Sequence, residues 1–249
     1  MTRRARLVFF DARVWRYVIS AISKVIDEGV FVIDNDGFRF RAMDPSRVLM
    51  VDLVFPPESF EEFEANERVE IGVNLEDVAK ILRRAVKEDK FVLEAEESRY
   101  SIIFWGRSTR KFVLPMLDVT AEDIPEPSLE LKAMARIMSD VYRDMIKDLE
   151  LIGENIKFYT DGEKFVASSS SELGEVEVEL SMEGGSLLDL QSEGEQSATY
   201  GLEYFSDLAS AARVADAIVI RFSTDMPAEI VHELPQGAKF TFIIAPRVE

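Results

Sequence analysis

Residues 37–53 gather side chains that could carry out chemistry, because Asp44, Ser46 and Arg47 stand almost side by side in the chain. An acid, a hydroxyl and a cation at such spacing are typical components of an active site. The same stretch alternates apolar and polar residues on both sides of Asp44-Pro45, a pattern that predicts two strands joined by a turn. At the level of these residues, a site for chemistry and a scaffold with another role both remain open.

Other candidate catalytic or metal-binding groups are weaker. Asp34, Asp36 and Asp44 could bind a metal ion, but a hairpin turn at residues 36–37 accounts for the first two. His232 is the only histidine, and a lone histidine in a strand is more often structural than a ligand. The serines at 168–171 lack the context of a nucleophile elbow, and no glycine-rich phosphate loop occurs. With no cysteine for thiolate catalysis or metal binding, we expect no catalytic residue, metal or cofactor, and hence no enzyme.

The composition is that of a globular protein with an acidic surface. The chain has 249 residues, 47% of them hydrophobic, and could form one large domain or two medium ones. Its net charge of −18 argues against DNA or anionic membranes as partners unless the 29 basic residues are concentrated in one place. No apolar run reaches the length of a membrane span. We therefore expect a soluble cytoplasmic protein, associated with the nucleoid if the source is prokaryotic.

The order of predicted elements occurs twice along the chain. The hairpin glycines Gly37 and Gly162 lie about half the chain apart, as do Gly72 and Gly201, which precede the second helix of each half. The predicted helices span residues 13–28, 75–86, 139–149 and 204–214. The predicted strands span residues 30–35, 38–43, 47–55, 91–96, 100–105, 111–114, 156–160, 164–168, 175–180, 217–222, 229–233 and 239–244.

This duplication predicts an α+β fold with two domains, residues 1–115 and 128–249, joined by a connecting loop at 116–127. Because the loop contains several prolines and acidic residues, we expect no helix or strand in it. It nevertheless carries the apolar residues Met116, Leu117, Val119 and Ile124, although linkers are usually polar.

Cations are concentrated on the predicted helices, on the side opposite their apolar residues. One such helix is ordinary for a solvated surface, but three helices at equivalent positions of a repeat are less easily dismissed. The fourth helix departs from the pattern, since it has a single cation. The cations are Arg13, Arg16 and Lys24; Lys80, Arg83, Arg84 and Lys87; Arg143 and Lys147; and Arg213.

Short motifs in the right order resemble those of one family. They lie at residues 5–8, 42–48, 71–75 with 80–82, 117–119 with 124–126, 151–153 and 245–249. They are spread over nearly the whole chain, which resembles the sliding clamps of the proliferating cell nuclear antigen (PCNA) family, the DNA-replication rings of archaea and eukaryotes.

The resemblance implies a ring of three subunits with pseudo-sixfold symmetry, in which helices line the hole and sheets lie outside. The cations would then face double-stranded DNA and contact phosphates independently of sequence. DNA polymerase, clamp loader, flap endonuclease and DNA ligase would be tethered through short peptide motifs. The alternative is a clamp-fold scaffold or checkpoint-type paralogue that is not a polymerase processivity factor. Whether three copies of this chain or a mixture of subunits form the ring stays open.

The resemblance also assigns the opening stretch to one wall of a partner-docking groove, so that Asp44-Pro45 is a turn rather than a catalytic acid. Family partners insert a glutamine, an aliphatic residue and paired aromatics there as a helical plug. For Ile243, strand core is an equally good interpretation. The groove residues implied are Met43, Arg47, Val48, Met50, Leu117, Val119, Ile124, Pro125, Pro227, Ile243, Ala245, Pro246 and Val248.

Subunit closure in the family uses one strand edge from each domain, which by position are residues 100–105 and 175–180. Cations near the first strand (Arg99, Arg107, Arg110 and Lys111) face acids on the second (Glu175, Glu177 and Glu179) in this prediction. The interface residues expected are Tyr100, Ile102, Phe104, Val176, Val178 and Leu180.

Overall fold

A computed structural model describes residues 3–65 and 67–247, in which helices pack on antiparallel sheets. The helices are α1 (Ala12–Ile22), α2 (Leu75–Leu82), α3 (Ser139–Glu150) and α4 (Leu202–Leu208), with short 3₁₀ turns η1 (Pro57–Ser59), η2 (Ala209–Arg213) and η3 (Pro235–Gly237). The strands of the first half are β1 (Ala5–Phe9), β2 (Glu28–Asp34), β3 (Gly37–Met43), β4 (Leu49–Phe55), β5 (Glu62–Ala65), β6 (Val69–Asn74), β7 (Lys90–Ala95), β8 (Arg99–Trp105) and β9 (Thr109–Pro115). Those of the second half are β10 (Ala133–Met138), β11 (Asn155–Thr160), β12 (Phe165–Ser171), β13 (Gly174–Leu180), β14 (Leu187–Ser192), β15 (Gln196–Gly201), β16 (Ala217–Phe222), β17 (Ala228–Glu233) and β18 (Lys239–Ile244).

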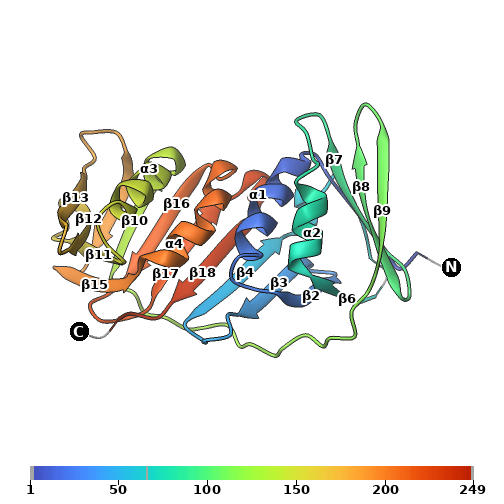
Figure 1. Cartoon of the computed structure of the whole chain (residues 1–249), viewed down its shortest axis with the longest axis horizontal. Helices are drawn as coiled ribbons and strands as arrows, with labels where there is room; N and C mark the ends of the chain where they lie inside the picture. Colours follow the sequence, from blue (N-terminus) through green and yellow to red (C-terminus); the bar gives the residue numbers. More distant parts are fainter. Residues whose placement is uncertain (1–2, 66, 248–249) are drawn as a thin grey trace.

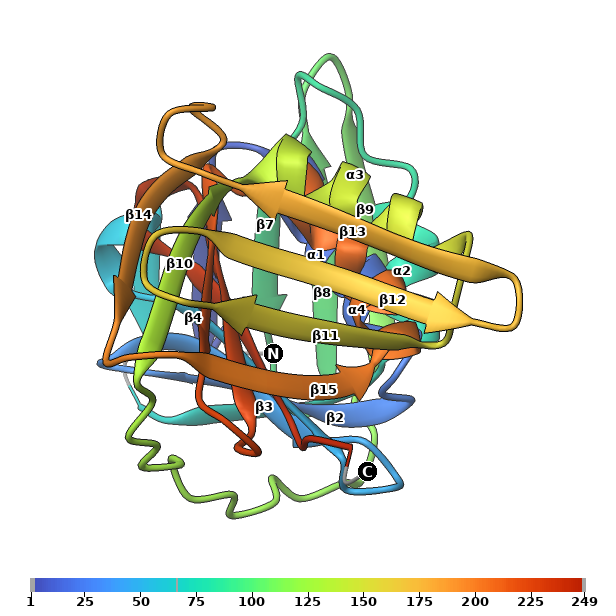
Figure 2. The same cartoon turned by 90° about the vertical axis from the view of Figure 1, so that its left-hand side faces the viewer.

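A nine-stranded sheet runs through both halves of the molecule, in the order β14-β10-β16-β17-β18-β4-β3-β2-β6. The halves meet where β18 pairs with β4, from Lys239 opposite Val54 to Ile244 opposite Leu49. A five-stranded sheet (β5-β1-β7-β8-β9) closes one end, and a four-stranded sheet (β13-β12-β11-β15) closes the other. Figure 2 looks onto the four-stranded end.

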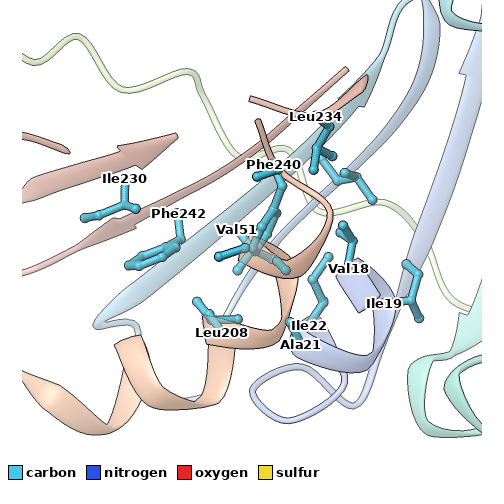
Figure 3. Close-up of a cluster of buried hydrophobic side chains, with 14 of the residues drawn as sticks. Val18, Ile19, Ala21, Ile22, Val51, Leu208, Ile230, Leu234, Phe240 and Phe242 are labelled. Atoms are coloured by element: carbon cyan, nitrogen blue, oxygen red, sulfur yellow. The ribbon is translucent and has the colours of Figure 1, made fainter. Parts of the chain in front are cut away.

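The four helices lie in one row along the long axis, in the order α3, α4, α1, α2 (Figure 1). Neighbours in this row contact one another, and η2 joins α1 to α3. Their apolar sides face the nine-stranded sheet: Val18 and Ile22 of α1 and Leu208 of α4 point toward Val51 and Phe242 (Figure 3). The polar side of every helix is therefore turned away from the sheet, and all four helices present it on the same side of the molecule.

The starts of α1 and α2 follow from local capping, whereas α3 and α4 begin without a side-chain cap. The carboxylate of Asp11 accepts a hydrogen bond from the backbone N–H of Arg13 (2.9 Å), and the amide oxygen of Asn74 accepts one from Asp77 (3.0 Å). Such side chains satisfy N–H groups that have no partner in the first turn of a helix. Both caps precede stretches with a clear apolar stripe, which is why these helices are predictable.

Three predicted helix ends are wrong. The first helix ends at Ile22 rather than residue 28, because residues 28–34 form β2 and pair with β6. The second ends at Leu82 rather than residue 86. The predicted helix 204–214 is α4 followed by the tighter turn η2. Strands β1, β5, β6, β10, β14 and β15 were not among the predicted strands.

Candidate nucleic-acid interface and docking groove

The predicted cations are all at least partly exposed on the helix row or directly after a helix. Arg13 and Arg16 belong to α1, Lys80 to α2, and Arg143 and Lys147 to α3. The remaining five follow helix ends: Lys24 after α1, Arg83, Arg84 and Lys87 after α2, and Arg213 at the end of η2. Since the helix row presents its polar side away from the sheet, cations from both halves share one surface.

Several of these cations are paired with acids on the same surface. Lys80 lies 3.0 Å from Glu76, and Lys147 lies 3.1 Å from Asp144. The hydrogen bond to Glu76 raises the pKa of Lys80 above its ordinary value, so the ammonium stays charged. Lys24 bridges α1 to Asp207 of α4 at 3.6 Å. Exposed pairs of this kind contribute at most about 1 kcal/mol, so a phosphate can replace the acid.

Three predicted cations from separate elements meet in one hollow. Arg13 of α1, Arg143 of α3 and Arg213 of η2 line a cavity of about 430 Å³, together with Phe10 and Tyr17. The guanidinium of Arg213 lies 5.7 Å from the centre of the Tyr17 ring. Asp11 also lines the hollow and lies 2.7 Å from the Arg13 guanidinium, so Arg143 and Arg213 are the cations that leave the lining positive and favour an anion such as a phosphate. Sequence spacing could not predict this meeting, because the contacts are long-range.

The Asp44 carboxylate is fully engaged in holding its turn. It is 6% exposed and accepts hydrogen bonds from the backbone N–H groups of Ser46 (3.1 Å), Val48 (2.8 Å) and Leu49 (2.7 Å), and from the Ser46 hydroxyl. Burial opposes its ionisation, but these hydrogen bonds outweigh burial and lower its pKa below the ordinary value. The turn interpretation of Asp44 agrees with this geometry, and Asp44 has no free oxygen directed at a reacting group.

The outer face of the sheet, opposite the helices, carries a row of apolar side chains beside this turn. Met43 of β3, Met50 of β4 and Ile243 of β18 are successive cross-strand partners. Phe242 and Ile244 belong to the buried core, whereas Ile243 points the other way, so the core interpretation of Ile243 is wrong. Met50 is only 6% exposed, so its neighbours in the row provide most of the exposed apolar surface.

The connecting loop crosses this outer face. The backbone N–H of Leu117 donates to the carbonyl of Gly72 in β6 (2.9 Å), and a Cβ on Gly72 would lie 2.2 Å from the Leu117 carbonyl. Farther along, Arg41 of β3 donates to the carbonyl of Ile124 (3.1 Å). A glycine at position 72 is therefore needed for the loop to approach the sheet.

Not every predicted groove residue lies beside the apolar row. Leu117 and Val119 pack against Gly72 of β6, which is three strands and roughly 14 Å from β4. Their role as groove walls stays a prediction. Val48 is joined to Ala245 by a backbone hydrogen bond of 2.9 Å, which brings the end of β18 to the turn. Pro125 is exposed, Pro227 and Pro246 are half-buried, and Val248 lies outside the described residues.

A second hollow, which the sequence did not predict, lies between the connecting loop and β2–β3. It has a volume of about 310 Å³ and is lined by Val30, Val32, Arg39 and Arg41, among others. Both arginines bind Asp52 in bidentate pairs. Burial opposes ionisation of Asp52, but the hydrogen bonds from the two arginines dominate and lower its pKa. The sequence signal for this cluster is the placement of Arg39, Arg41 and Asp52 at alternating positions of two adjacent strands.

The predicted edge strand in the first half is wrong. Tyr100, Ile102 and Phe104 belong to β8, which is paired with β7 on one side and β9 on the other, and all three are buried. The edge is β9, the next strand along the chain. Because β8 and β9 both have strand-like sequences, the pattern alone could not tell which of them lies outermost.

In the second half, β13 is an edge strand of its sheet, as predicted. Val176, Val178 and Leu180 face the core of their own half, while Glu175, Glu177 and Glu179 are exposed. Two leucines near this edge are unusually exposed: Leu151, at the end of α3, by 74% and Leu173, in the β12–β13 turn, by 81%. The Ser171 hydroxyl donates to the Ile152 carbonyl (2.6 Å), which ties the two segments together.

His232 is buried in β17, against the rings of Tyr142, Phe240 and Phe242. Burial lowers its pKa from 6.5 to about 3, so the imidazole is neutral. Within residues 3–65 and 67–247, no three His, Asp or Glu side chains are grouped to hold a metal ion. Over the same residues, no helix is long and apolar enough to cross a membrane.

Comparisons with known proteins match the whole of this architecture. The family model "Proliferating cell nuclear antigen, N-terminal domain" matches residues 5–124, and the corresponding C-terminal model matches residues 123–247. "DNA polymerase sliding clamp 3" of Aeropyrum pernix is 42% identical over 98% of this chain and 99% of its own length. "DNA polymerase sliding clamp" of Pyrococcus furiosus is 35% identical, over 98% of each chain.

Solved structures agree. The chain is similar to PCNA from Thermococcus kodakaraensis, with a TM-score of 0.91 and 30% identity over 98% of this chain and 100% of the other. It is also similar to a chain of the PCNA2–PCNA3 complex from Sulfolobus tokodaii, with a TM-score of 0.92 and 31% identity over the same shares. With both domain models, full-length relatives and the duplicated α+β fold in agreement, this chain belongs to the proliferating cell nuclear antigen family.

Proposed function

We propose that the chain is a subunit of a ring-shaped DNA polymerase sliding clamp that encircles double-stranded DNA. The observation that carries this proposal is the single row of helices, drawn from both halves, that presents ten cations in a chain of net charge −18. Helices that cross a duplex contact phosphates without reading bases, so binding is independent of sequence. Residues 1–115 and 128–249 are the two proposed clamp domains, with 116–127 as the connecting loop.

Ring closure is proposed to pair the β9 edge of one subunit with the β13 edge of the next. The two edges lie at opposite ends of the molecule (Figure 1), as a head-to-tail ring requires. Pairing would remove both exposed edges and cover Leu151 and Leu173. The exposed charges of the two edges are opposite, since β9 carries Lys111, which lies 3.2 Å from Glu94 of its own subunit, and β13 carries Glu175, Glu177 and Glu179.

The outer face around Met43 and Ile243 is the proposed docking groove for replication and repair proteins. DNA polymerase, clamp loader, flap endonuclease and DNA ligase are the proposed partners, each through a short apolar peptide motif. Support comes from the row of apolar side chains on the outer face of the sheet, which lies beside the turn that Asp44 holds. The protein acts here by tethering rather than by catalysis.

The test replaces the cations that follow α2. A Lys80→Gln/Arg83→Gln/Arg84→Gln/Lys87→Gln variant should lose most retention on nicked circular DNA and most stimulation of polymerase processivity. The control, Lys132→Gln/Lys239→Gln, removes exposed cations outside the helix row and should behave as wild type. Full retention and processivity in the quadruple variant would refute the DNA-lining role. A clamp-fold scaffold without a DNA role would show that result while still binding partner peptides.

A further inference from the structure

Arg47 has a backbone conformation that is unusual for its residue type. Its φ of 58° lies in the left-handed region, which residues other than glycine seldom adopt. The turn is held in this state by Asp44, whose carboxylate accepts hydrogen bonds from the N–H groups on both sides of Arg47. Because these hydrogen bonds fix the strained backbone of Arg47, they also fix the direction in which its side chain leaves the turn.

The side chain of Arg47 extends over the docking groove. One guanidinium nitrogen, Nη1, lies 4.0 Å from the sulfur of Met43, and Nη2 lies 2.7 Å from Oε1 of Glu122 in the connecting loop. Met43 begins the apolar row of the groove floor. The Arg47–Glu122 ion pair therefore spans the groove from turn to loop and covers part of its floor.

We propose that Arg47 determines which partner peptides the groove accepts. A peptide whose apolar plug reaches Met43 must first displace the guanidinium from Glu122. The displaced cation then lies beside an apolar contact, where a counter-charge on the peptide stabilises it. A partner with a carboxylate next to its apolar residues supplies one, so the groove favours such peptides over neutral ones. This inference rests on the proposed docking function.

The exchange is inexpensive, and it leaves the loop in place. The side chains of Arg47 and Glu122 are 68% and 51% exposed, and an exposed pair contributes little net free energy. The loop keeps its other anchor, the hydrogen bond from Arg41 to the Ile124 carbonyl, and the Arg41 side chain is only 12% exposed. Arg41 is a permanent attachment, and Arg47 is an exchangeable one.

The experiment measures binding of two fluorescein-labelled synthetic peptides by fluorescence anisotropy. Both contain the glutamine, aliphatic residue and paired aromatics of the family motif, and they differ only in a Glu or a Gln directly after the aromatics. The proteins are full-length wild type, Glu122→Gln and Arg47→Gln. The matched control is Glu126→Gln, which removes another exposed acid from the same loop without touching Arg47.

The wild type should bind the Glu peptide more tightly than the Gln peptide. Glu122→Gln should strengthen binding of both peptides by about 1.5- to fivefold, the equivalent of one exposed ion pair. Arg47→Gln should strengthen binding of the Gln peptide similarly and abolish the preference for Glu. Equal effects of Glu122→Gln and Glu126→Gln, or weaker binding of the Gln peptide by Arg47→Gln, would overturn the inference. If neither peptide binds wild type, the docking function itself fails.

Discussion

The buried imidazole of His232 makes stability depend on pH between about 5 and 6.5, above the ordinary pKa values of Asp and Glu side chains. The chain has one histidine and no cysteine, and hydrogen bonds hold the pKa values of Asp44 and Asp52 below their ordinary value. The folded-state pKa of His232 is about 3, against 6.5 for an exposed histidine. Between these two values the unfolded chain binds a proton that the folded chain rejects, so stability falls as pH decreases from 6.5 toward 3.

The magnitude follows from the difference between the two pKa values. Each pH unit within the window is worth about 1.4 kcal/mol, so His232 alone should lower the free energy of unfolding by roughly 2 kcal/mol between about pH 8 and about pH 5. Urea unfolding at both values, followed by the fluorescence of Trp15 and Trp105 at a fixed protein concentration, measures the change. A His232→Gln variant has no titrating group at this position and should lose this contribution, so its stability should fall less from pH 8 to pH 5 than that of the wild type, whatever its absolute stability.

Equal pH slopes for wild type and His232→Gln would refute the reasoning, because they would mean that the imidazole is not held neutral in the core. The comparison of slopes, rather than of absolute stabilities, removes the cost of repacking Tyr142, Phe240 and Phe242 around a different side chain.

Three further predictions concern the helix row, the connecting loop and the subunit edge. Arg143→Gln/Arg213→Gln should weaken binding to linear duplex DNA and reduce the slope of log affinity against log salt by roughly 2, as two lost phosphate contacts require, whereas Lys132→Gln/Lys239→Gln should keep the wild-type slope. Gly72→Ala places a methyl group against the Leu117 carbonyl, so it should cost about 1–3 kcal/mol in urea unfolding and speed proteolysis of the loop; Gly184→Ala, whose Cβ meets nothing closer than 3.6 Å, should do neither. Glu177→Lys/Glu179→Lys should reduce the mass seen by light scattering from that of a closed ring to that of free subunits, while Glu126→Lys/Glu130→Lys, in and directly after the connecting loop, should not; an unchanged mass in the first variant would refute the charge pairing at the β13 edge.

Much of the fold could be predicted because its signals are local. Asp11 and Asn74 cap helices through their own first turns, and Gly37 and Gly162 adopt positive φ in the two hairpins, as turn chemistry requires. The duplicated order of elements follows from these repeated local signals. The predicted end of the first helix is wrong because Glu28 belongs to β2, where it pairs with Asn74. Helix propensity does not include this contact.

The site was less predictable, because it depends on which segments meet. The types and exposure of the cations could be predicted, but the hollow shared by Arg13, Arg143 and Arg213 is made by three separate elements. Nothing in the residues around Leu117 distinguishes packing on Gly72 from lining the groove. Similarly, β8 and β9 both have strand-like sequences, and only the strand order shows that β9 is the outer one.

The pairing of β18 with β4 has a mechanical consequence. A subunit whose halves share one uninterrupted hydrogen-bonded ladder behaves as a stiff arc, because bending at its midpoint would have to break several backbone bonds at once. In a circular assembly of such arcs, compliance is confined to the seams between chains. A complex that loads the ring onto DNA would therefore open an interface between subunits, and each subunit would keep its shape during loading.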